Sequence, residues 1–234
     1  MKFDGQVVMI TGAAGSLGRA TAQAFTQAGA RCILLDNNAE GLRDAYGGDS
    51  KNQLSLVADL ADDAGLARAV EQAAETFGGI QVLCNVAGGF RMGTPVHDTP
   101  PDIWRLMIEL NAGSIIAVSR FVVPRMLAAG SGKIVNIAAM GGMRGGANMG
   151  AYAAAKSAVM RLTESMAAEL RDKNINVNCV LPSIIDTPAN RADMPKADAK
   201  KWVAPAALAD VILFLASDQA RAVHGAALPV VGLS

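Results

Sequence analysis

Short apolar runs alternate with longer amphipathic segments along almost the whole chain of 234 residues. This alternation is typical of repeated βαβ units, in which each strand is followed by a helix. The runs are continuous in Val, Ile and Leu, which favours strands that are covered by helices on both faces of a sheet. The sequence therefore predicts one α/β domain over residues 1–234, built on a doubly wound, parallel, seven-stranded sheet.

The limits of the elements follow from the ends of these runs. The predicted strands are Gln6–Thr11, Arg31–Leu35, Gln53–Ala58, Ile80–Cys84, Lys133–Ala138, Ile175–Leu181 and Ala226–Val231. The predicted helices are Leu17–Ala28, Ala39–Tyr46, Asp62–Phe77, Asp102–Ala129, Ala151–Arg171 and Pro205–Ser217.

The charge balance excludes several classes of partner. Lys+Arg and Asp+Glu both number 21, so the formal net charge is zero. A neutral chain without basic tracts is poorly suited to binding nucleic acid or an anionic membrane surface. No uncharged run approaches the roughly 18–20 apolar residues of a membrane span, and the first residues lack the pattern of a secretory leader. We expect a cytoplasmic protein whose partner is a small-molecule substrate.

The cysteines and histidines give no sign of a metal site. Cys32, Cys84 and Cys179 all lie in apolar stretches, so we expect buried free thiols in a reducing compartment. His97 and His224 are the only histidines, and they form no cluster with the spacing of metal ligands. No metal is therefore expected.

Three loops interrupt the alternation, and all three follow predicted strands. Gly88–Pro101 and Gly141–Gly150 are rich in Gly and Pro, and Pro182–Ala204 is long and polar. Ligands of doubly wound sheets bind beyond the carboxyl ends of the strands, so the three loops are expected at the binding edge. We expect the segment from about 183 to 204 to form a lid over the substrate.

A glycine-rich turn joins the first predicted strand to the first predicted helix. Gly12 permits a tight turn, Gly15 lets the backbone approach a pyrophosphate, and Gly18 permits close packing of the helix on the strand. The N–H groups at the start of the helix then face the phosphates. The alternative is that the glycines only form a turn.

Asp36 closes the second predicted strand. A carboxylate at this place accepts hydrogen bonds from the ribose hydroxyls of an adenine dinucleotide and repels a 2′-phosphate. The sequence thus favours NAD(H) over NADP(H), unless Asp36 merely caps the next helix.

Tyr152 and Lys156 lie four residues apart in an Ala-rich segment, so a helix places both on one face. A phenol is a useful acid or base near neutral pH only when its anion is stabilised, and a neighbouring ammonium group does this. The alternative is an ordinary surface pair.

The chain as a whole resembles the short-chain dehydrogenase/reductase family. The resemblance is carried by Thr11–Gly18, Asp59-Leu60, Asn85–Gly88, Asn111, Tyr152 with Lys156, and Pro182 with Thr187, in that order. It implies a Rossmann-like fold and an NAD(H)-dependent oxidoreductase that transfers a hydride to or from a small substrate.

The resemblance also implies a role for each matching residue. Tyr152 would exchange a proton with the substrate oxygen, while Lys156 would bind the nicotinamide ribose and lower the pKa of Tyr152. Asn111 would hold a water that relays protons to Lys156. The expected cofactor-binding residues are Gly12, Ala14, Gly15, Ser16, Leu17, Gly18, Asp36, Asp59, Leu60, Asn85, Ala87, Gly88, Tyr152, Lys156, Pro182, Ile185 and Thr187.

The chain departs from the family pattern at one catalytic position. The family usually has a serine thirteen residues before the tyrosine, where this chain has Ala139. Loss of a donor to a developing oxyanion typically lowers a rate by roughly 10²–10³. Either the chain is a catalytically silent NAD-binding regulator or scaffold, or its substrate needs only Tyr152 as donor.

A narrower resemblance, to the quinonoid dihydropteridine reductase-like branch, favours the second reading. It rests on Leu83–Gly89, on Gly150–Tyr152 with Lys156, and on Asp186–Trp202. That branch also lacks the serine, and its quinonoid substrate is intrinsically easy to reduce.

The expected substrate pocket is apolar and pliable. Its residues are Phe90, Ala139, Met140, Met149 and Ser183, whose hydroxyl would partly replace the missing donor. Arg91 and Arg144 either meet an anionic substrate or are solvated, and we favour solvation. The resemblance implies that the helices Asp102–Ala129 and Ala151–Arg171 build a homodimer, often within a homotetramer.

Overall fold

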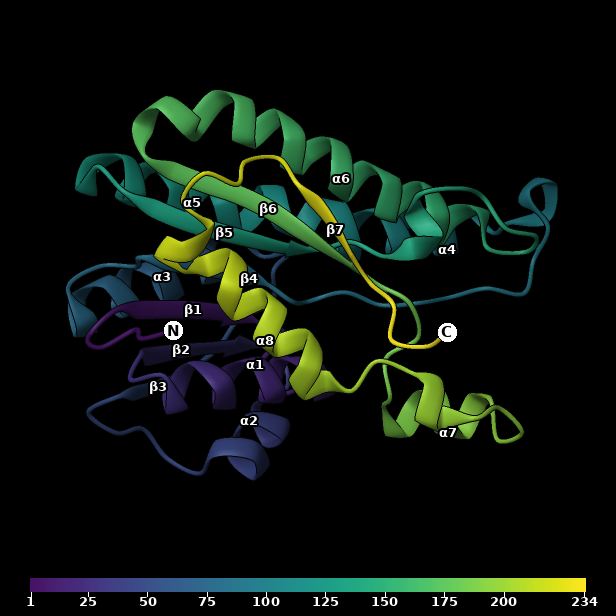
Figure 1. Cartoon of the computed structure of the whole chain (residues 1–234), viewed down its shortest axis with the longest axis horizontal. Coiled ribbons are helices and arrows are strands. Elements are labelled where there is room, and N and C mark those ends of the chain that lie inside the picture. The colour runs from purple at the N-terminus through teal and green to yellow at the C-terminus, as the bar shows by residue number, and fades with distance from the viewer.

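The computed structural model describes residues 1–234, and its centre is a single parallel sheet of seven strands (Figure 1). The strands follow the order β3-β2-β1-β4-β5-β6-β7 across the sheet. Their bounds are β1 Val7–Thr11, β2 Arg31–Asp36, β3 Gln53–Val57, β4 Val82–Asn85, β5 Gly132–Ile137, β6 Ile175–Pro182 and β7 Ala227–Val230. The prediction of a doubly wound, seven-stranded, Rossmann-like domain is confirmed.

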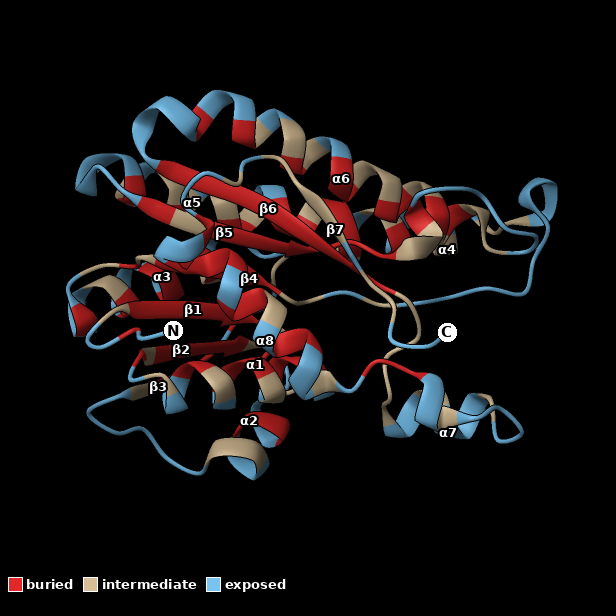
Figure 2. Cartoon of the chain, in the orientation of Figure 1, coloured by how far each residue is buried: buried red, intermediate tan, exposed pale blue.

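Helices cover both faces of this sheet. The bounds are α1 Ser16–Gln27, α2 Ala39–Tyr46, α3 Asp63–Phe77, α4 Pro101–Ile108, α5 Ser114–Ala129, α6 Gly150–Leu170, α7 Pro188–Asp193 and α8 Pro205–Ala216. On one face, Val8 and Ile10 of β1 belong to the same core cluster as residues of α1, α2 and α8. On the other face, Val7 and Met9 of β1 share a cluster with residues of α3, α5 and α6. Figure 2 shows the result, with buried strands between helices that expose only their outer sides.

Burial on both faces explains why the strands read as continuous apolar runs. All residues of β1, β4 and β6 are buried, with no polar outer face that alternates with an inner one. The three cysteines lie within this apolar interior as free buried thiols, as predicted.

The long predicted helix Asp102–Ala129 is not uniform. A π-helical turn over Glu109–Gly113 separates α4 from α5. Such turns insert one extra residue into a helix and occur frequently at functional sites. The predicted helical stretch is therefore confirmed over Pro101–Ala129, and the π-helical turn inside it is a feature that the apolar spacing did not reveal, because one inserted residue barely changes that spacing.

The helical segment Pro101–Ala129 is long and apolar enough, by length and composition only, to cross a membrane. The apolar residues on its inner side belong to the protein core, because Val118, Val122 and Met126 pack against the sheet. Its outer side leaves Ile116 and Leu127 exposed.

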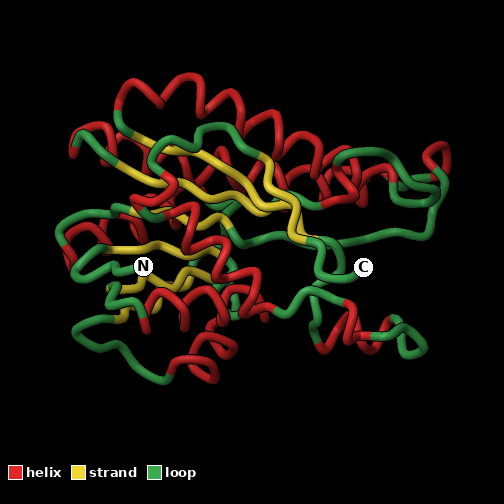
Figure 3. Tube along the Cα trace, viewed as in Figure 1, coloured by secondary structure: helices red, strands yellow, loops and turns green.

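The segment expected to be a lid carries short helices that the sequence did not predict. It contains α7 and a 3₁₀ turn over Ala199–Lys201, and it stands away from the sheet near the C-terminus (Figures 1 and 3). Thr187 begins α7 by accepting a hydrogen bond from the N–H of Asn190 (3.2 Å). The base of the segment is closed where Ile185 and Val203 form an isolated parallel bridge.

The order of the strands places the binding crevice. The chain builds outward from β1 to β2 and β3, then returns to β4 on the other side of β1. Loops that leave β1 and β4 therefore diverge to opposite faces, which opens a crevice beyond their carboxyl ends.

Candidate active site

The glycine-rich turn after β1 is shaped by contacts that no larger residue permits. Gly12 has φ of +66°, and a Cβ there would lie 2.7 Å from the Cα of Ala87. A Cβ on Gly18 would lie 2.1 Å from the carbonyl oxygen of Gly12. These two glycines therefore let the turn lie against the end of β4 and let α1 lie against the turn.

Gly15 differs from the other two glycines. It is the N-cap of α1, has extended backbone angles, and provides no side chain to cap the helix. The first turn of α1 carries no acidic residue, so its N–H groups are left for a ligand. A Cβ on Gly15 would meet only the oxygen of Gly12, at 3.3 Å.

Three side chains hold the backbone of this turn from behind. The Tyr46 hydroxyl donates to the carbonyl of Ala13 (2.6 Å), and the Nε of Arg19 donates to the carbonyl of Ala14 (2.7 Å). The N–H of Ala14 donates to the Asp36 carboxylate (2.9 Å). We call Arg19, Asp36 and Tyr46 the turn brace.

Asp36 is not the cap of the following helix. The side chain of Asn38 caps α2 by accepting from the N–H of Gly41 (2.9 Å). Asp36 instead accepts from the N–H groups of Ala14 and Asn38, each at 2.9 Å, which fixes its carboxylate at the end of β2.

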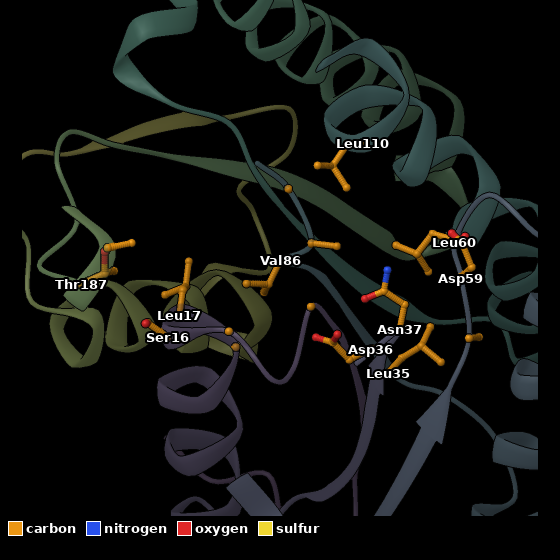
Figure 4. Close-up of a pocket in the computed structure, with 17 residues that line it drawn as sticks. Ser16, Leu17, Leu35, Asp36, Asn37, Asp59, Leu60, Val86, Leu110 and Thr187 are labelled. Carbon is orange, nitrogen blue, oxygen red and sulfur yellow. The ribbon is translucent and has the colours of Figure 1, made fainter. Parts of the chain in front are cut away.

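A cavity of about 390 Å³ runs along the carboxyl ends of β1, β2 and β4. In Figure 4, Thr187 lies at one end, Asp59 and Leu60 at the other, and Val86 between them. Its lining includes most of the residues expected to bind a dinucleotide: Gly12, Gly15, Ser16, Leu17, Gly18, Asp36, Asp59, Leu60, Ala87, Gly88 and Thr187. The sequence did not single out Leu35, Asn37, Ala58, Val86, Leu110 or Ala189, which complete it.

Other expected cofactor residues lie outside this lining. The N–H of Ala14 faces Asp36, and Asn85 is buried below the crevice, where its Nδ2 donates to the Oδ1 of Asn136 (2.8 Å). Pro182 is the buried last residue of β6, and Ile185 pairs with Val203 at the base of the lid segment. In this structure Asn85 therefore supports the floor from beneath, without lining the cavity itself.

The expected catalytic residues converge beyond the end of β4. A Cβ on Gly88 would lie 2.9 Å from the Asn111 Oδ1 and 3.4 Å from the Lys156 Nζ. The ammonium of Lys156 donates to the carbonyl of Ile137 (2.8 Å) and lies 6.0 Å from the centroid of the Tyr152 ring. The helical spacing thus brings Tyr152 and Lys156 to the same place, and the surface-pair alternative is excluded because Lys156 is buried.

Asn111 is fixed by the π-helical turn. Its side chain accepts from the N–H of Gly89 (3.2 Å) and donates to the carbonyls of Gly89 (3.1 Å) and Met107 (3.0 Å). These bonds hold the loop after β4 against the helix. The proton relay expected through Asn111 stays a prediction.

Burial dominates the acid–base properties of the pair. It raises the pKa of Tyr152 to about 12 and lowers the pKa of Lys156 to about 8, because both charged forms lose contact with water. Lys156 was expected to lower the pKa of Tyr152, but at this separation its charge does not outweigh burial in the ligand-free chain.

Three of the residues expected around the substrate, Phe90, Ala139 and Met149, lie on different segments. Phe90 packs edge-on against Tyr152, with 4.7 Å between the ring centroids. Ala139 is buried just before the 3₁₀ turn that begins at Met140. Met149 reaches toward Gly141, whose Cβ would lie 3.2 Å from the Met149 Cε and 3.5 Å from the ring of Tyr152.

Ser183 makes its hydrogen bonds within the protein. Its hydroxyl donates to the carbonyl of Val231 (2.9 Å) and pairs with the hydroxyl of Ser234 (2.7 Å). The segment after β7 therefore engages this hydroxyl in the structure, and its service to a substrate stays a prediction.

Comparison with known proteins identifies the family. The family model described as short chain dehydrogenase matches residues 6–198. The chain is 34% identical over 244 residues to a 3-oxoacyl-[acyl-carrier-protein] reductase of Thermotoga maritima, covering 99% of this chain and 98% of the relative. The chain belongs to the short-chain dehydrogenase family. It is an oxidoreductase, and its similar proteins include reductases and dehydrogenases of several substrate classes.

One further relative and two solved structures extend this result for the short-chain dehydrogenase. It is 35% identical over 246 residues to a cis-4-hydroxycyclohexanecarboxylate dehydrogenase of Sinomonas cyclohexanicum, covering 98% of this chain and 96% of the relative. The structure of levodione reductase superposes with a TM-score of 0.91 at 29% identity, covering 99% of this chain and 98% of that one. A xylitol dehydrogenase of the same fold was solved with NAD⁺ bound.

The cavity of this short-chain dehydrogenase fits a nicotinamide dinucleotide. A Cβ on Gly12 or Gly18 would collide with backbone, whereas a Cβ on Gly15 would meet only the oxygen of Gly12, at 3.3 Å, beside the first N–H groups of α1 and at the edge of the cavity. Ser16, Leu17 and Gly18 would meet the pyrophosphate, and Asp36 the adenosine ribose.

We expect Gly15→Ala and Gly18→Ala to separate cofactor binding from turn formation. The Gly15→Ala methyl group would enter the cavity, so NADH affinity should fall about tenfold or more while the free energy of unfolding stays within about 0.5 kcal/mol of wild type. Gly18→Ala should lower both, because its Cβ meets backbone. NADH titration and urea unfolding test this, and unchanged NADH affinity in Gly15→Ala would support glycines that only form a turn.

The lowered pKa of Lys156 predicts a pH-dependent stability in the cofactor-free enzyme. Below pH 8 both the folded and unfolded states hold the proton, and burial of the ammonium costs stability. From about 8 to 10.5 the unfolded state holds more protons than the folded state, so this contribution raises stability as pH rises. Lys156→Met should thus be about 2 kcal/mol more stable than wild type at pH 7. Urea unfolding at pH 7 and pH 10 should show this difference shrinking, whereas an equal difference would argue against the shift.

Proposed function

We propose that the chain is an NAD(H)-dependent oxidoreductase acting on a small carbonyl or alcohol, or on a quinonoid dihydropterin-like ring. The observation that carries this proposal is the meeting of Asn111 and Lys156 at Gly88, which lines the dinucleotide cavity. The Lys156 Nζ also lies 6.0 Å from the centroid of the Tyr152 ring. The bound nicotinamide would supply or accept the hydride. In the reducing direction, the Tyr152 hydroxyl would donate its proton to the substrate atom that gains the electron pair.

The surroundings of the Tyr152 hydroxyl suit this role. It makes no hydrogen bond within the protein, so it is free to meet a substrate. The raised pKa keeps the phenol protonated at neutral pH, which favours donation in the reducing direction. For oxidation the phenolate is needed, and Lys156 would stabilise it once ligands draw the two groups together.

Asp36 supports a preference for NAD(H) over NADP(H). The cavity lining contains the carboxylates of Asp36 and Asp59 and no Lys or Arg. An added 2′-phosphate would therefore meet negative charge and find no cationic partner. Comparable kcat/KM values with NADH and NADPH would overturn this part of the proposal.

Ala139 points to a substrate that is easy to reduce. The family pattern supplies two hydroxyl donors to a developing oxyanion, a serine and the tyrosine. With Ala139 at the serine position, only the Tyr152 hydroxyl remains. A quinonoid ring delocalises the incoming charge and needs less such help, which supports the dihydropterin-like class. Names of relatives such as cyclohexanol dehydrogenase of Acinetobacter sp. favour small cyclic alcohols and ketones as the other class.

The second candidate function is a catalytically silent NAD-binding regulator or scaffold. Ala139 favours it, because the hydroxyl that usually assists Tyr152 is absent. It predicts tight NADH binding, no turnover and no loss of biological function in Tyr152→Phe.

We infer that the protein acts in the cytoplasm as a homodimer or homotetramer. Free buried cysteines suit a reducing compartment, and Trp104, Ile116 and Leu127 are large apolar side chains exposed on α4 and α5. A mass in solution that is a multiple of 24.1 kDa would support the assembly, and fractionation of cells tests the compartment.

Tyr152→Phe tests the enzymatic proposal. Without the hydroxyl, no side chain is left to donate the proton, so we expect kcat to fall by at least about 10²-fold. NADH affinity should change less than about threefold, because Tyr152 does not line the dinucleotide cavity. Stopped-flow NADH oxidation and fluorescence titration measure the two quantities. Equal turnover by wild type and Tyr152→Phe would contradict the assignment of this residue.

Ala139→Ser tests the substrate class. We expect the wild type to reduce quinonoid dihydropterin faster than a simple β-ketoester. Restoring the hydroxyl should raise kcat for the β-ketoester by roughly 10- to 100-fold and change the dihydropterin rate by no more than about threefold. Ala138→Ser is the matched control on the neighbouring buried residue. No gain for the β-ketoester would show that the absent donor does not limit the site.

A further inference from the structure

A second cavity, of about 190 Å³, lies next to Tyr152 and shares no lining residue with the dinucleotide cavity. Three segments enclose it: the loop after β4, the start of α4 and the start of α6. In Figure 1 the first of these segments runs far beyond the sheet before it returns to α4. The lining residues are Arg91, Met92, Thr94, Thr99, Pro100, Ile103, Asn148, Met149, Gly150 and Ala151.

The cavity is close to the proposed proton donor, both along the chain and in space. Arg91 directly follows Phe90, whose ring packs on Tyr152, and Ala151 directly precedes Tyr152. Met149 and Tyr152 both approach Gly141, where a Cβ would lie 3.2 Å from one and 3.5 Å from the other. Phe90 and Met149 therefore place this cavity beside the Tyr152 ring.

The cavity has a positive charge and no negative one. Arg91 is its only charged lining residue, and the Arg91 guanidinium forms no ion pair. Its Nη1 donates to the carbonyl of Phe90 (2.8 Å), which leaves most of its donors free. The nearest acids along the chain, Asp98 and Asp102, do not line the cavity, and Asp98 pairs with His97 (3.4 Å).

The remaining lining is mixed. The hydroxyl of Thr94 makes no hydrogen bond in the protein, whereas that of Thr99 donates to the carbonyl of Pro95 (3.1 Å). Met92, Ile103 and Met149 supply apolar and, in the case of methionine, adaptable surface. Such a site suits a short apolar group that ends in an anion, because guanidinium groups bind carboxylates in a planar, two-pronged geometry.

We propose that this cavity binds the carboxylate of an anionic substrate through Arg91, while the reacting carbonyl or hydroxyl of the same substrate meets Tyr152. The inference rests on the proposed function and narrows its carbonyl or alcohol class to small oxo acids or hydroxy acids. The volume is below the roughly 300–1,000 Å³ of sites for drug-sized ligands. One end of a small molecule therefore fits, and a bulky carrier does not.

The same geometry distinguishes Arg91 from Arg144, which the sequence treats alike. Both side chains are exposed, but Arg91 lines the second cavity whereas Arg144, in the loop before α6, lines neither cavity. It serves as the matched control for a change of charge near the site.

The test compares 4-oxocyclohexanecarboxylate with its neutral methyl ester as substrates for the NADH-loaded enzyme. We expect Arg91→Gln to lower kcat/KM for the acid by roughly 10- to 100-fold, mainly through KM, and to change the ester less than about threefold. Arg91→Lys should retain part of the preference for the acid. Arg144→Gln should behave as wild type with both compounds. Equal losses for acid and ester in Arg91→Gln would overturn the proposal.

A binding measurement separates this inference from the proposed reaction. Calorimetry of cyclohexanecarboxylate and of neutral cyclohexylmethanol with the NADH-loaded enzyme needs no turnover. Tighter binding of the carboxylate that is lost in Arg91→Gln and kept in Arg144→Gln would support the site, even if no ketone were reduced. Equal binding of the two compounds by wild type, or of the carboxylate by wild type and Arg91→Gln, would refute the site while leaving the oxidoreductase proposal intact.

Discussion

The close approach of two strand ends is the contact on which the rest of the site depends. At the end of β1 the Thr11 hydroxyl oxygen accepts from the N–H groups of Val86 and Ala87, each at 3.1 Å. Beside it, Gly12 lies so near Ala87 that no Cβ fits between them. Because β1 leads to the glycine turn and β4 leads to the catalytic side, this junction sets the position of one half of the crevice relative to the other.

From this junction the site divides into a rigid half and a buried half. The rigid half is mainly backbone: a turn of glycines and small residues, followed by a helix that begins without a side-chain cap. The buried half depends on Lys156, which is shielded from water and donates a hydrogen bond to the carbonyl of Ile137. A buried ammonium in that position destabilises the folded protein. The presence of Lys156 is therefore explained by its roles toward a ligand and toward Tyr152, and not by a contribution to stability.

The sequence was sufficient to predict the sheet, its helices and most of the dinucleotide cavity. The sheet and helices follow from the periodicity of apolar residues, and the cavity follows from the spacing of the glycines after the first strand. Both patterns can be read directly from the sequence. The π-helical turn at Asn111 was not visible, because one inserted residue barely changes an apolar pattern. The balance of burial and charge at Tyr152, the use of Ser183 by the segment after β7, and the cavity around Arg91 depend on distances in space, which spacing along the chain does not give.

The turn brace has a consequence for how a dinucleotide is received. Its three side chains hold the peptide groups on both sides of Ala14 before any ligand arrives. One of them, Tyr46, lies at the far end of α2. The entropy of ordering this backbone is then lost during folding, and association does not incur it again. A pre-organised turn favours fast capture without rearrangement, and it lets a side chain such as Tyr46, which touches no ligand, influence how long the dinucleotide resides.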